Sequence, residues 1–135
     1  MTHRLTIRVY YEDTDLAGVV YYANYLKFME RGRTEALRAA GVDQVRLKEA
    51  LGLVFVVRSL AIDYLTPARF DDLIEVRTRI TRLRGASVEM GQEVWRNDAC
   101  LARASVTTAC MDDRGRPARL PAEVRQRLSQ FAAAE

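Results

Sequence analysis

The sequence contains very little histidine and cysteine. His3 is the single histidine, and Cys100 and Cys110 are the only cysteines among 135 residues. A Cys/His metal site needs about four such ligands, so these counts predict no metal centre. A Ser-His-Asp or Cys-His nucleophile would have to use His3, near the start of the chain. The two cysteines lie ten residues apart in one strand-like run, too far for a disulfide, and we expect both to be reduced core residues.

Long apolar runs and dense basic runs are also missing. No stretch of about 18 apolar residues could cross a membrane as a helix, and MTHRLTIRVYY at the N-terminus lacks the features of a signal peptide. The net charge is +3, from 21 basic and 18 acidic residues. The basic residues are not clustered with aromatic residues, which argues against a nucleic-acid surface. We expect a soluble, cytoplasmic protein without an integral membrane segment.

The length and composition indicate one domain with its own core. With 135 residues and 49% hydrophobic content, the chain falls in the commonest size range of domains, about 100–150 residues. We expect residues 1–135 to form a single domain. A domain of this size still exposes about a third of its unfolded surface, so association with a second copy is also possible.

Periodic patterns predict both helices and strands. Alternation predicts a half-buried strand over residues 4–11, and helical spacing predicts a long helix from Asn24, a candidate N-cap, to Ala40, followed by Gly41. The remaining predicted elements are a short helix at 44–51 between Asp43 and Gly52, strands at 53–65, 73–83, 88–96 and up to 111, and a helix after Pro121. This order predicts an α+β fold, in which an antiparallel five-stranded sheet wraps around one long helix.

Two details of the pattern concern packing. Residues 53–65 are apolar at both odd and even positions, which predicts a strand covered on both faces. Gly32 lies inside the long helix, where glycine costs about 1 kcal/mol relative to alanine, and close packing would offset that cost. Small side chains alternate along residues 100–110, so we expect Gly32 to pack against this row.

The most unusual stretch is YYEDTDLAGVVYYANYLKFME, residues 10–30. Asp15 follows the first predicted strand, Gly18 permits a turn, and the long helix begins shortly after. A helix N-terminus carries unpaired N–H groups and about half a positive charge, so it can hold a carbonyl oxygen on which Asp15 could act. The alternative is that Asp15 caps an Asx-turn, as many loop aspartates do. We expect Asp13 to be structural and Glu12 to be solvated.

The aromatic residues of this stretch permit two interpretations. Most often such a set, here Tyr21, Tyr22, Tyr25 and Phe28, belongs to the core, which is the favoured interpretation, and a site for an acyl or aryl group also needs aromatic walls.

Four segments resemble one enzyme family, in the same order along the chain. They are YYEDTDLAGVVYYANYLKFMERGRTEAL (10–37), LTPARFDDLIEV (65–76), TRLRGASVEMGQE (81–93) and DRGRPARLP (113–121). Together they resemble the hotdog-fold thioesterases, in particular the Tol–Pal-associated acyl-CoA thioesterases and the 4-hydroxybenzoyl-CoA thioesterases. The resemblance implies a hotdog fold, assembly into homodimers or homotetramers, and an active site between two subunits.

The resemblance also implies roles for particular residues. Asp15 matches the catalytic aspartate, and Tyr22 matches the position whose backbone N–H polarises the thioester carbonyl. Many Tol–Pal-associated members have histidine at the Tyr22 position. This chain has tyrosine there, as the hydroxybenzoyl-specific relatives do, so the resemblance implies the backbone role of Tyr22 and not a side-chain acid/base role. The loop Arg82–Ser87 matches the loop that binds CoA phosphates, which makes Arg82, Arg84 and Ser87 the candidate substrate-binding residues. Two further arginines, Arg116 and Arg119, either contact the CoA phosphates as well or are ordinary surface charges.

These assignments predict hydrolysis of an acyl-CoA to a free carboxylic acid and CoA, without a metal or organic cofactor. Asp15 is ionised at neutral pH and would act as general base or as nucleophile. A non-catalytic acyl-thioester-binding or envelope-associated scaffold of the same fold is the alternative. A hydratase or dehydratase is disfavoured because such enzymes pair a carboxylate with histidine. The acyl group remains open, as does the thiol carrier, CoA or an acyl carrier protein.

Overall fold

The computed structural model describes residues 1–134, and residue 135, the last of the expected domain, lies outside them. The described chain forms a five-stranded antiparallel sheet, three α-helices and a short 3-10 helix. In chain order these are β1 (Thr2–Arg8), the 3-10 helix (Tyr11–Asp13), α1 (Asn24–Ala39), α2 (Gln44–Leu51), β2 (Val54–Tyr64), β3 (Leu73–Leu83), β4 (Ser87–Arg96), β5 (Ala99–Met111) and α3 (Ala122–Ala133).

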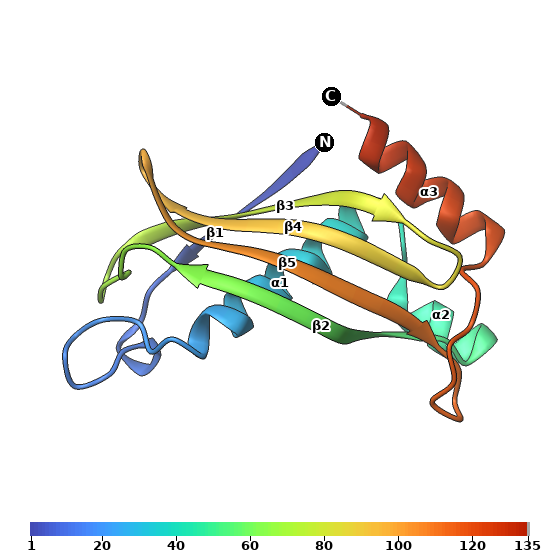
Figure 1. The fold of residues 1–135 in the computed structure, drawn as a ribbon, viewed down its shortest axis with the longest axis horizontal. Coiled ribbons are helices and arrows are strands. Elements are labelled where there is room, and N and C mark those ends of the chain that lie inside the picture. The colour runs from blue at the N-terminus through green and yellow to red at the C-terminus, as the bar shows by residue number, and fades with distance from the viewer. Residues whose placement is uncertain (135) are drawn as a thin grey trace.

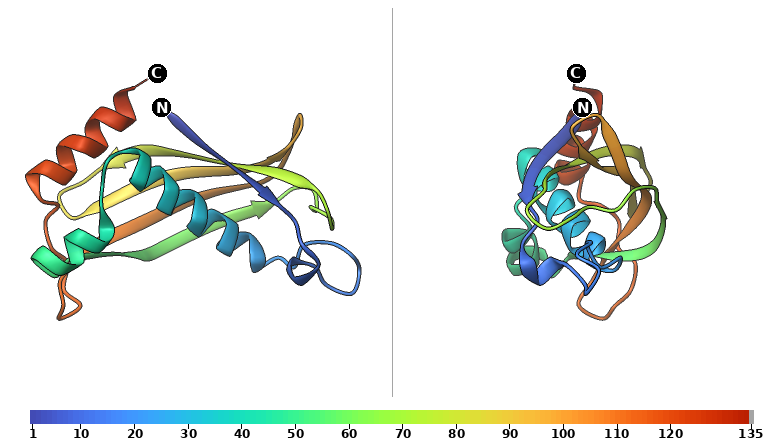
Figure 2. Two further views of the ribbon diagram at one scale, coloured as in Figure 1. Left: turned by 180° about the vertical axis from the view of Figure 1, so that it is seen from behind. Right: turned by 90° about the vertical axis from the view of Figure 1, so that its left-hand side faces the viewer.

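The sheet curls around α1, as predicted. Its strand order is β1-β3-β4-β5-β2, and each pair of neighbours is antiparallel. Figure 1 shows the sheet along its length, and the end-on view in Figure 2 shows α1 inside the curl. The C-terminal helix α3 lies beside the β3–β4 turn, and the N-terminal amino group donates to Ala132 O at 3.2 Å. No helix in residues 1–134 is long and apolar enough to cross a membrane.

Local signals determine where the helices end. Gly41, with φ +87°, follows α1, and Gly52, with φ +65°, ends α2. Asp43 caps α2 by accepting a hydrogen bond from Arg46 N at 3.1 Å, as predicted. The predicted N-cap of α1 is wrong: the N-cap is Ala23, and Asn24 is the first helical residue. Its side-chain amide is used elsewhere, as described below.

Gly32 allows α1 to approach the sheet closely. A Cβ at this position would lie 2.6 Å from Val76 Cγ1, 3.0 Å from Thr78 Oγ1 and 3.2 Å from Gln92 Nε2. The contact is therefore with β3 and β4, and the prediction that Gly32 packs against the small-residue row of β5 is wrong. Periodicity identifies the buried face of a helix, whereas the crossing point depends on how the sheet curls beneath it.

A buried polar cluster crosses the core under α1. Thr78 and Gln92, neighbours on β3 and β4, separate two apolar clusters and are fully buried. Gln92 Nε2 donates to Met29 O and to Thr78 Oγ1, both at 2.9 Å. Gln92 Oε1 accepts from Arg33 Nη1 at 3.0 Å. We call Arg33, Thr78 and Gln92 the polar belt. It ties α1 to the middle of the sheet.

The belt contains a buried charge. Arg33 is nine-tenths buried, and this burial lowers the pKa of its guanidinium, partly offset by nearby Glu30. No carboxylate lies within ion-pair distance of Arg33 in the part of the chain that the structure describes. Gln92 is thus the acceptor that compensates this arginine. Next to the belt, opposite Thr78, the Nδ1 atom of His3 is buried and unpartnered within residues 1–134.

Two strand predictions need correction. β1 ends at Arg8, not at Tyr11, because the Asp13 carboxylate accepts from Tyr10 N at 2.8 Å and turns the chain into the 3-10 helix. β2 is an edge strand, and its Val56 and Val57 are 38% and 48% exposed. The prediction that both faces of this strand are covered is therefore wrong for a single chain. β2 therefore carries more apolar side chains than the rest of this chain covers.

Candidate active site

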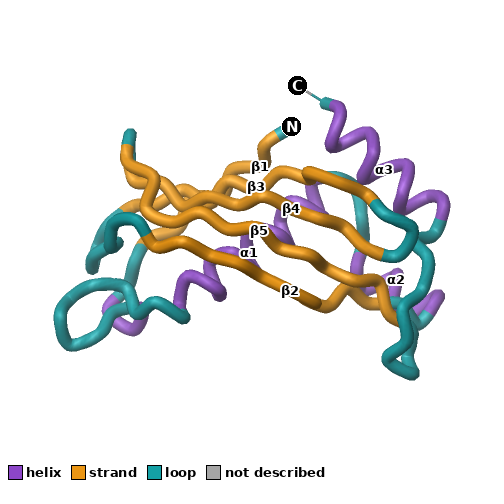
Figure 3. Tube along the Cα trace, viewed as in Figure 1, coloured by secondary structure: helices purple, strands orange, loops and turns teal. Residues whose placement is uncertain are grey.

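Asp15 is the first residue of a tight, folded-back turn. Asp15 N–H donates to Val19 O at 2.9 Å, and Gly18, with φ +78°, donates to Asp15 O at 3.0 Å. The returning chain is held by Tyr21 N–H, which donates to Asp13 O at 3.1 Å. The turn therefore starts and ends beside the 3-10 helix and leads directly into α1. Figure 3 shows this loop at one end of the sheet.

The Asp15 side chain is exposed, and only one of its two carboxylate oxygens accepts a hydrogen bond in the described part of the chain. Its Oδ1 accepts from Ala17 N at 2.9 Å, which is the Asx-turn that the sequence offered as the alternative. The second carboxylate oxygen has no hydrogen-bond donor among residues 1–134. The Asx-turn therefore orients the carboxylate without saturating it. Whether this carboxylate acts on a carbonyl at the α1 N-terminus stays a prediction.

Asp13 has the structural role that the sequence predicts. Its Oδ2 accepts from Tyr10 N, and its Oδ1 accepts from Asn24 Nδ2, both at 2.8 Å. The carboxylate thereby joins the end of the first strand region to the first residue of α1. Glu12 is exposed, as expected of a solvated neighbour.

A second loop, residues 66–72, supports the Asp15 turn. Val20 N–H donates to Ala68 O at 2.8 Å, and Phe70 N–H donates to Gly18 O at 3.4 Å. Ala68 N–H donates to the Tyr25 hydroxyl at 2.9 Å. The LTPARFDD segment of the sequence therefore positions the turn from the side, a role that no local pattern indicated.

The aromatic residues divide between core and surface. Tyr25 and Phe28 belong to α1 and lie on its buried face, whereas Tyr21 and Tyr22, just before α1, are 49% and 61% exposed. Tyr22 O accepts from the Tyr64 hydroxyl at 2.9 Å and from Tyr25 N at 3.3 Å. Nothing within residues 1–134 accepts a hydrogen bond from Tyr22 N–H. The start of α1 therefore presents a backbone donor that is free to bind a ligand.

Tyr64, on β2, is a site residue that sequence reasoning missed. Partial burial raises the pKa of its hydroxyl, and neighbouring Tyr22 and Tyr25 raise it further, so the group stays protonated and donates at neutral pH. The only signal was a tyrosine at the end of an apolar run. Its contact with Tyr22 joins residues 42 positions apart.

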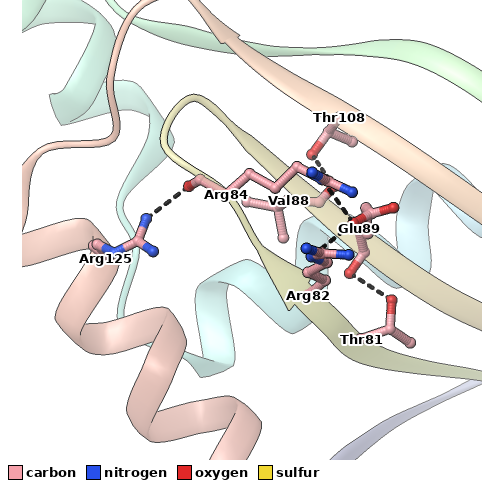
Figure 4. A network of polar contacts seen from close by, with 7 residues as sticks. All are labelled: Thr81, Arg82, Arg84, Val88, Glu89, Thr108 and Arg125. Atoms are coloured by element: carbon pink, nitrogen blue, oxygen red, sulfur yellow. Dashed lines mark hydrogen bonds and ion pairs between the residues drawn. The ribbon is translucent and has the colours of Figure 1, made fainter.

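The predicted phosphate-binding arginines lie around the β3–β4 turn. Arg84 Nε and Arg82 Nε lie 3.1 and 3.9 Å from the same atom, Glu89 Oε2 (Figure 4). Arg84 O accepts from Arg125 Nη1 at 2.6 Å, and the Arg119 guanidinium lies beside Gly85. Because two guanidinium groups share one carboxylate, the turn carries excess positive charge.

Ser87 is placed differently from the two arginines. Ser87 is buried, with 5% of its surface exposed, and its backbone carbonyl accepts a hydrogen bond from Arg84 N at 2.9 Å. It borders a cavity of about 230 Å³ between β2, β5 and the turn. Its assignment to substrate binding stays a prediction.

The two halves of the candidate site lie at opposite ends of one chain. Figure 1 shows the Asp15 segment at one end of the sheet and the β3–β4 turn at the other. A strand of the length of β3, Leu73–Leu83, spans roughly 33 Å at about 3.3 Å per residue. The structure thus places Asp15 and Tyr22 on one segment, and Arg82 and Arg84 around one carboxylate, but it does not join the two pairs within one chain. Residues 1–134 contain no group of three His, Cys, Asp or Glu side chains that could hold a metal ion.

An antiparallel sheet curled around one central helix, with a polar turn leading into that helix, is the hotdog fold that the sequence predicts. The Thioesterase superfamily matches residues 17–102, and the chain belongs to this superfamily.

Individual relatives agree with this membership. The chain is 47% identical over 120 residues to the acyl-CoA thioesterase YbgC of Haemophilus influenzae, covering 88% of each chain. It is 42% identical over 123 residues to the acyl-CoA thioester hydrolase YbgC of Escherichia coli O157:H7, covering 90% of this chain and 91% of that protein. The crystal structure of a probable thioesterase from Bartonella henselae superposes with a TM-score of 0.86 at 42% identity, covering 90% of this chain and all of that one.

Proposed function

We propose that this protein hydrolyses an acyl-CoA thioester to a free carboxylic acid and CoA. Relatives that are 42–47% identical over about nine-tenths of the chain are named acyl-CoA thioesterases or thioester hydrolases. The observation that carries the proposal is the unpartnered Tyr22 N–H at the start of α1, in the segment that also presents Asp15.

The proposed chemistry needs one carboxylate and one oxyanion site. Tyr22 N–H and the N-terminus of α1 hold the thioester carbonyl oxygen and stabilise the negative charge that develops on it. In one route Asp15 takes a proton from water, the hydroxide adds to the carbonyl carbon, and the C–S bond breaks to release the thiolate. In the other route Asp15 attacks the carbonyl directly, and water then hydrolyses the resulting anhydride. A thiolate is a good leaving group, so neither route needs a triad.

We assign recognition of the CoA phosphates to Arg82 and Arg84, with Ser87 on the same loop. The support is electrostatic: two half-exposed guanidinium groups share Glu89, so either can turn to a phosphate without leaving a buried charge unpaired. Arg119, beside Gly85, is the next candidate.

Arg84→Gln is expected to raise KM for acyl-CoA by roughly tenfold, because a charge-assisted phosphate contact is lost. The KM for the corresponding N-acetylcysteamine thioester, which lacks the nucleotide and its phosphates, should not change. Steady-state kinetics with both substrates test this. Arg103→Gln, which removes another exposed arginine paired with one glutamate, Glu93, is the matched control. An equal rise in KM for both thioesters would contradict phosphate binding by Arg84.

A homodimer or homotetramer is part of the proposal. A second copy can supply a β3–β4 turn to the Asp15 end, since in one chain these two features lie at opposite ends of the sheet, in which β3 spans roughly 33 Å. It can also cover the exposed apolar residues of β2. We expect light scattering to give a mass of two or four times 15.4 kDa, and a monomer at assay concentration would contradict a shared site.

The decisive experiment is to measure thiol release by the purified protein from aliphatic and aryl CoA thioesters and from an acyl-(acyl carrier protein). Turnover of a CoA thioester supports the proposal, and the ranking of substrates identifies the acyl group and the carrier. Binding without thiol release would favour the acyl-thioester-binding or envelope-associated scaffold instead.

Cytoplasmic location also belongs to the proposal and is supported by two free cysteines, Cys100 and Cys110.

A further inference from the structure

Tyr64 contacts the backbone of the proposed oxyanion site from a distant strand. It is the last residue of β2, and its hydroxyl donates to Tyr22 O at 2.9 Å. Its ring lies edge-on to Tyr22, at 6.1 Å and 89°, and to Tyr25, at 5.3 Å and 68°. The hydroxyl is thereby directed at one carbonyl group by packing on two sides.

The contact completes the restraints on Tyr22. The preceding residue is held by the hydrogen bond from Tyr21 N to Asp13 O, and Tyr22 O accepts from both Tyr64 and Tyr25. The 3.3 Å bond from Tyr25 N is long, so the Tyr64 hydroxyl makes the shorter of the two contacts. Tyr22 N–H lies in the peptide plane of Tyr21 O, which accepts from Asn24 N at 2.8 Å, and Tyr64 restrains the adjoining plane of Tyr22 O. Together these contacts restrain the direction of the free Tyr22 N–H.

We propose that Tyr64 is a positioning residue, which orients Tyr22 N–H toward the thioester carbonyl without itself touching the reacting atoms. This inference rests on the proposed function, in which Tyr22 N–H binds that carbonyl. An oxyanion donor is effective only when it points at the place where charge develops, and small misplacements are costly in rate. Tyr64 therefore affects catalysis through the backbone of Tyr22.

The kinetic test is Tyr64→Phe, which keeps the ring and its packing and removes only the hydroxyl. We expect kcat to fall by roughly five- to tenfold, the effect of one neutral hydrogen bond, with KM within about twofold of wild type. Tyr11→Phe is the matched control, because Tyr11 is 82% exposed. Within residues 1–134, the only aromatic ring that its own ring contacts is that of Phe70. Light scattering should give the same mass for both variants. An unchanged kcat for Tyr64→Phe, or a change in KM alone, would overturn the proposal.

A spectroscopic test separates this inference from the function on which it rests. In Asp15→Asn protein with bound acyl-CoA, we expect the thioester carbonyl stretch to lie at lower frequency than in free acyl-CoA, because the donor polarises the bond. Adding Tyr64→Phe should move the band back toward the free value. If the band is shifted in Asp15→Asn and is not moved by Tyr64→Phe, the positioning role is wrong. If Asp15→Asn alone shows no shift, carbonyl binding by Tyr22 is wrong, and the inference falls with it.

Discussion

Asp15→Asn should lower kcat for acyl-CoA hydrolysis by roughly a thousandfold, within the range of about 10²–10⁴ that a general base contributes. Asparagine has the same size, and its Oδ1 can still accept from Ala17 N, so the turn should keep its shape. The amide can neither take a proton from water nor attack the carbonyl. KM should change little, because substrate binding depends on other groups. Thiol release under saturating acyl-CoA measures the effect.

Glu12→Gln is the control for this substitution. Glu12 is an exposed carboxylate three residues earlier, so its removal changes the local charge equally without touching the Asp15 turn. We expect its kcat to stay within about twofold of wild type. A kcat for Asp15→Asn that matches the control would remove Asp15 from the mechanism, and a loss caused by misfolding would show as a lower unfolding midpoint.

Gln92→Leu should lower the free energy of unfolding by about 2–4 kcal/mol. Leucine fills a similar volume, but Arg33 loses its buried acceptor, and Met29 O and Thr78 Oγ1 lose a donor. The cost is large because Arg33 is charged and nine-tenths buried, so its guanidinium has little access to water as a substitute. Urea unfolding at a fixed protein concentration measures the change, which keeps any association constant between variants.

Gln126→Leu, the same chemical change on the exposed side of α3, is the comparison and should stay within about 0.5 kcal/mol of wild type. If Gln92→Leu unfolds at the same urea concentration as Gln126→Leu, the polar belt does not stabilise the fold. A gain in stability would mean that apolar packing at this position outweighs the buried hydrogen bonds.

The secondary structure follows closely from local features of the chain. The predicted bounds of α2 and β3 agree with the structure, because Asp43, Gly52 and the alternation of apolar residues act within a few positions. The end of β1 was wrong for a reason that is also local. The alternation continues to Tyr11, but the Asp13 carboxylate takes the Tyr10 N–H and ends the strand earlier.

The sequence by itself determined the order of elements, the face that α1 buries and the turn that carries Asp15. Periodicity, glycine and capping residues specify these features through contacts of a few residues. The tertiary structure alone decided that Gly32 meets β3 and β4, that Gln92 compensates Arg33, and that Tyr64 holds Tyr22. These contacts join residues 42 to 63 positions apart. They depend on strand order and on the curl of the sheet, which periodicity does not encode. The length of the strands places the β3–β4 arginines far from Asp15 in one chain.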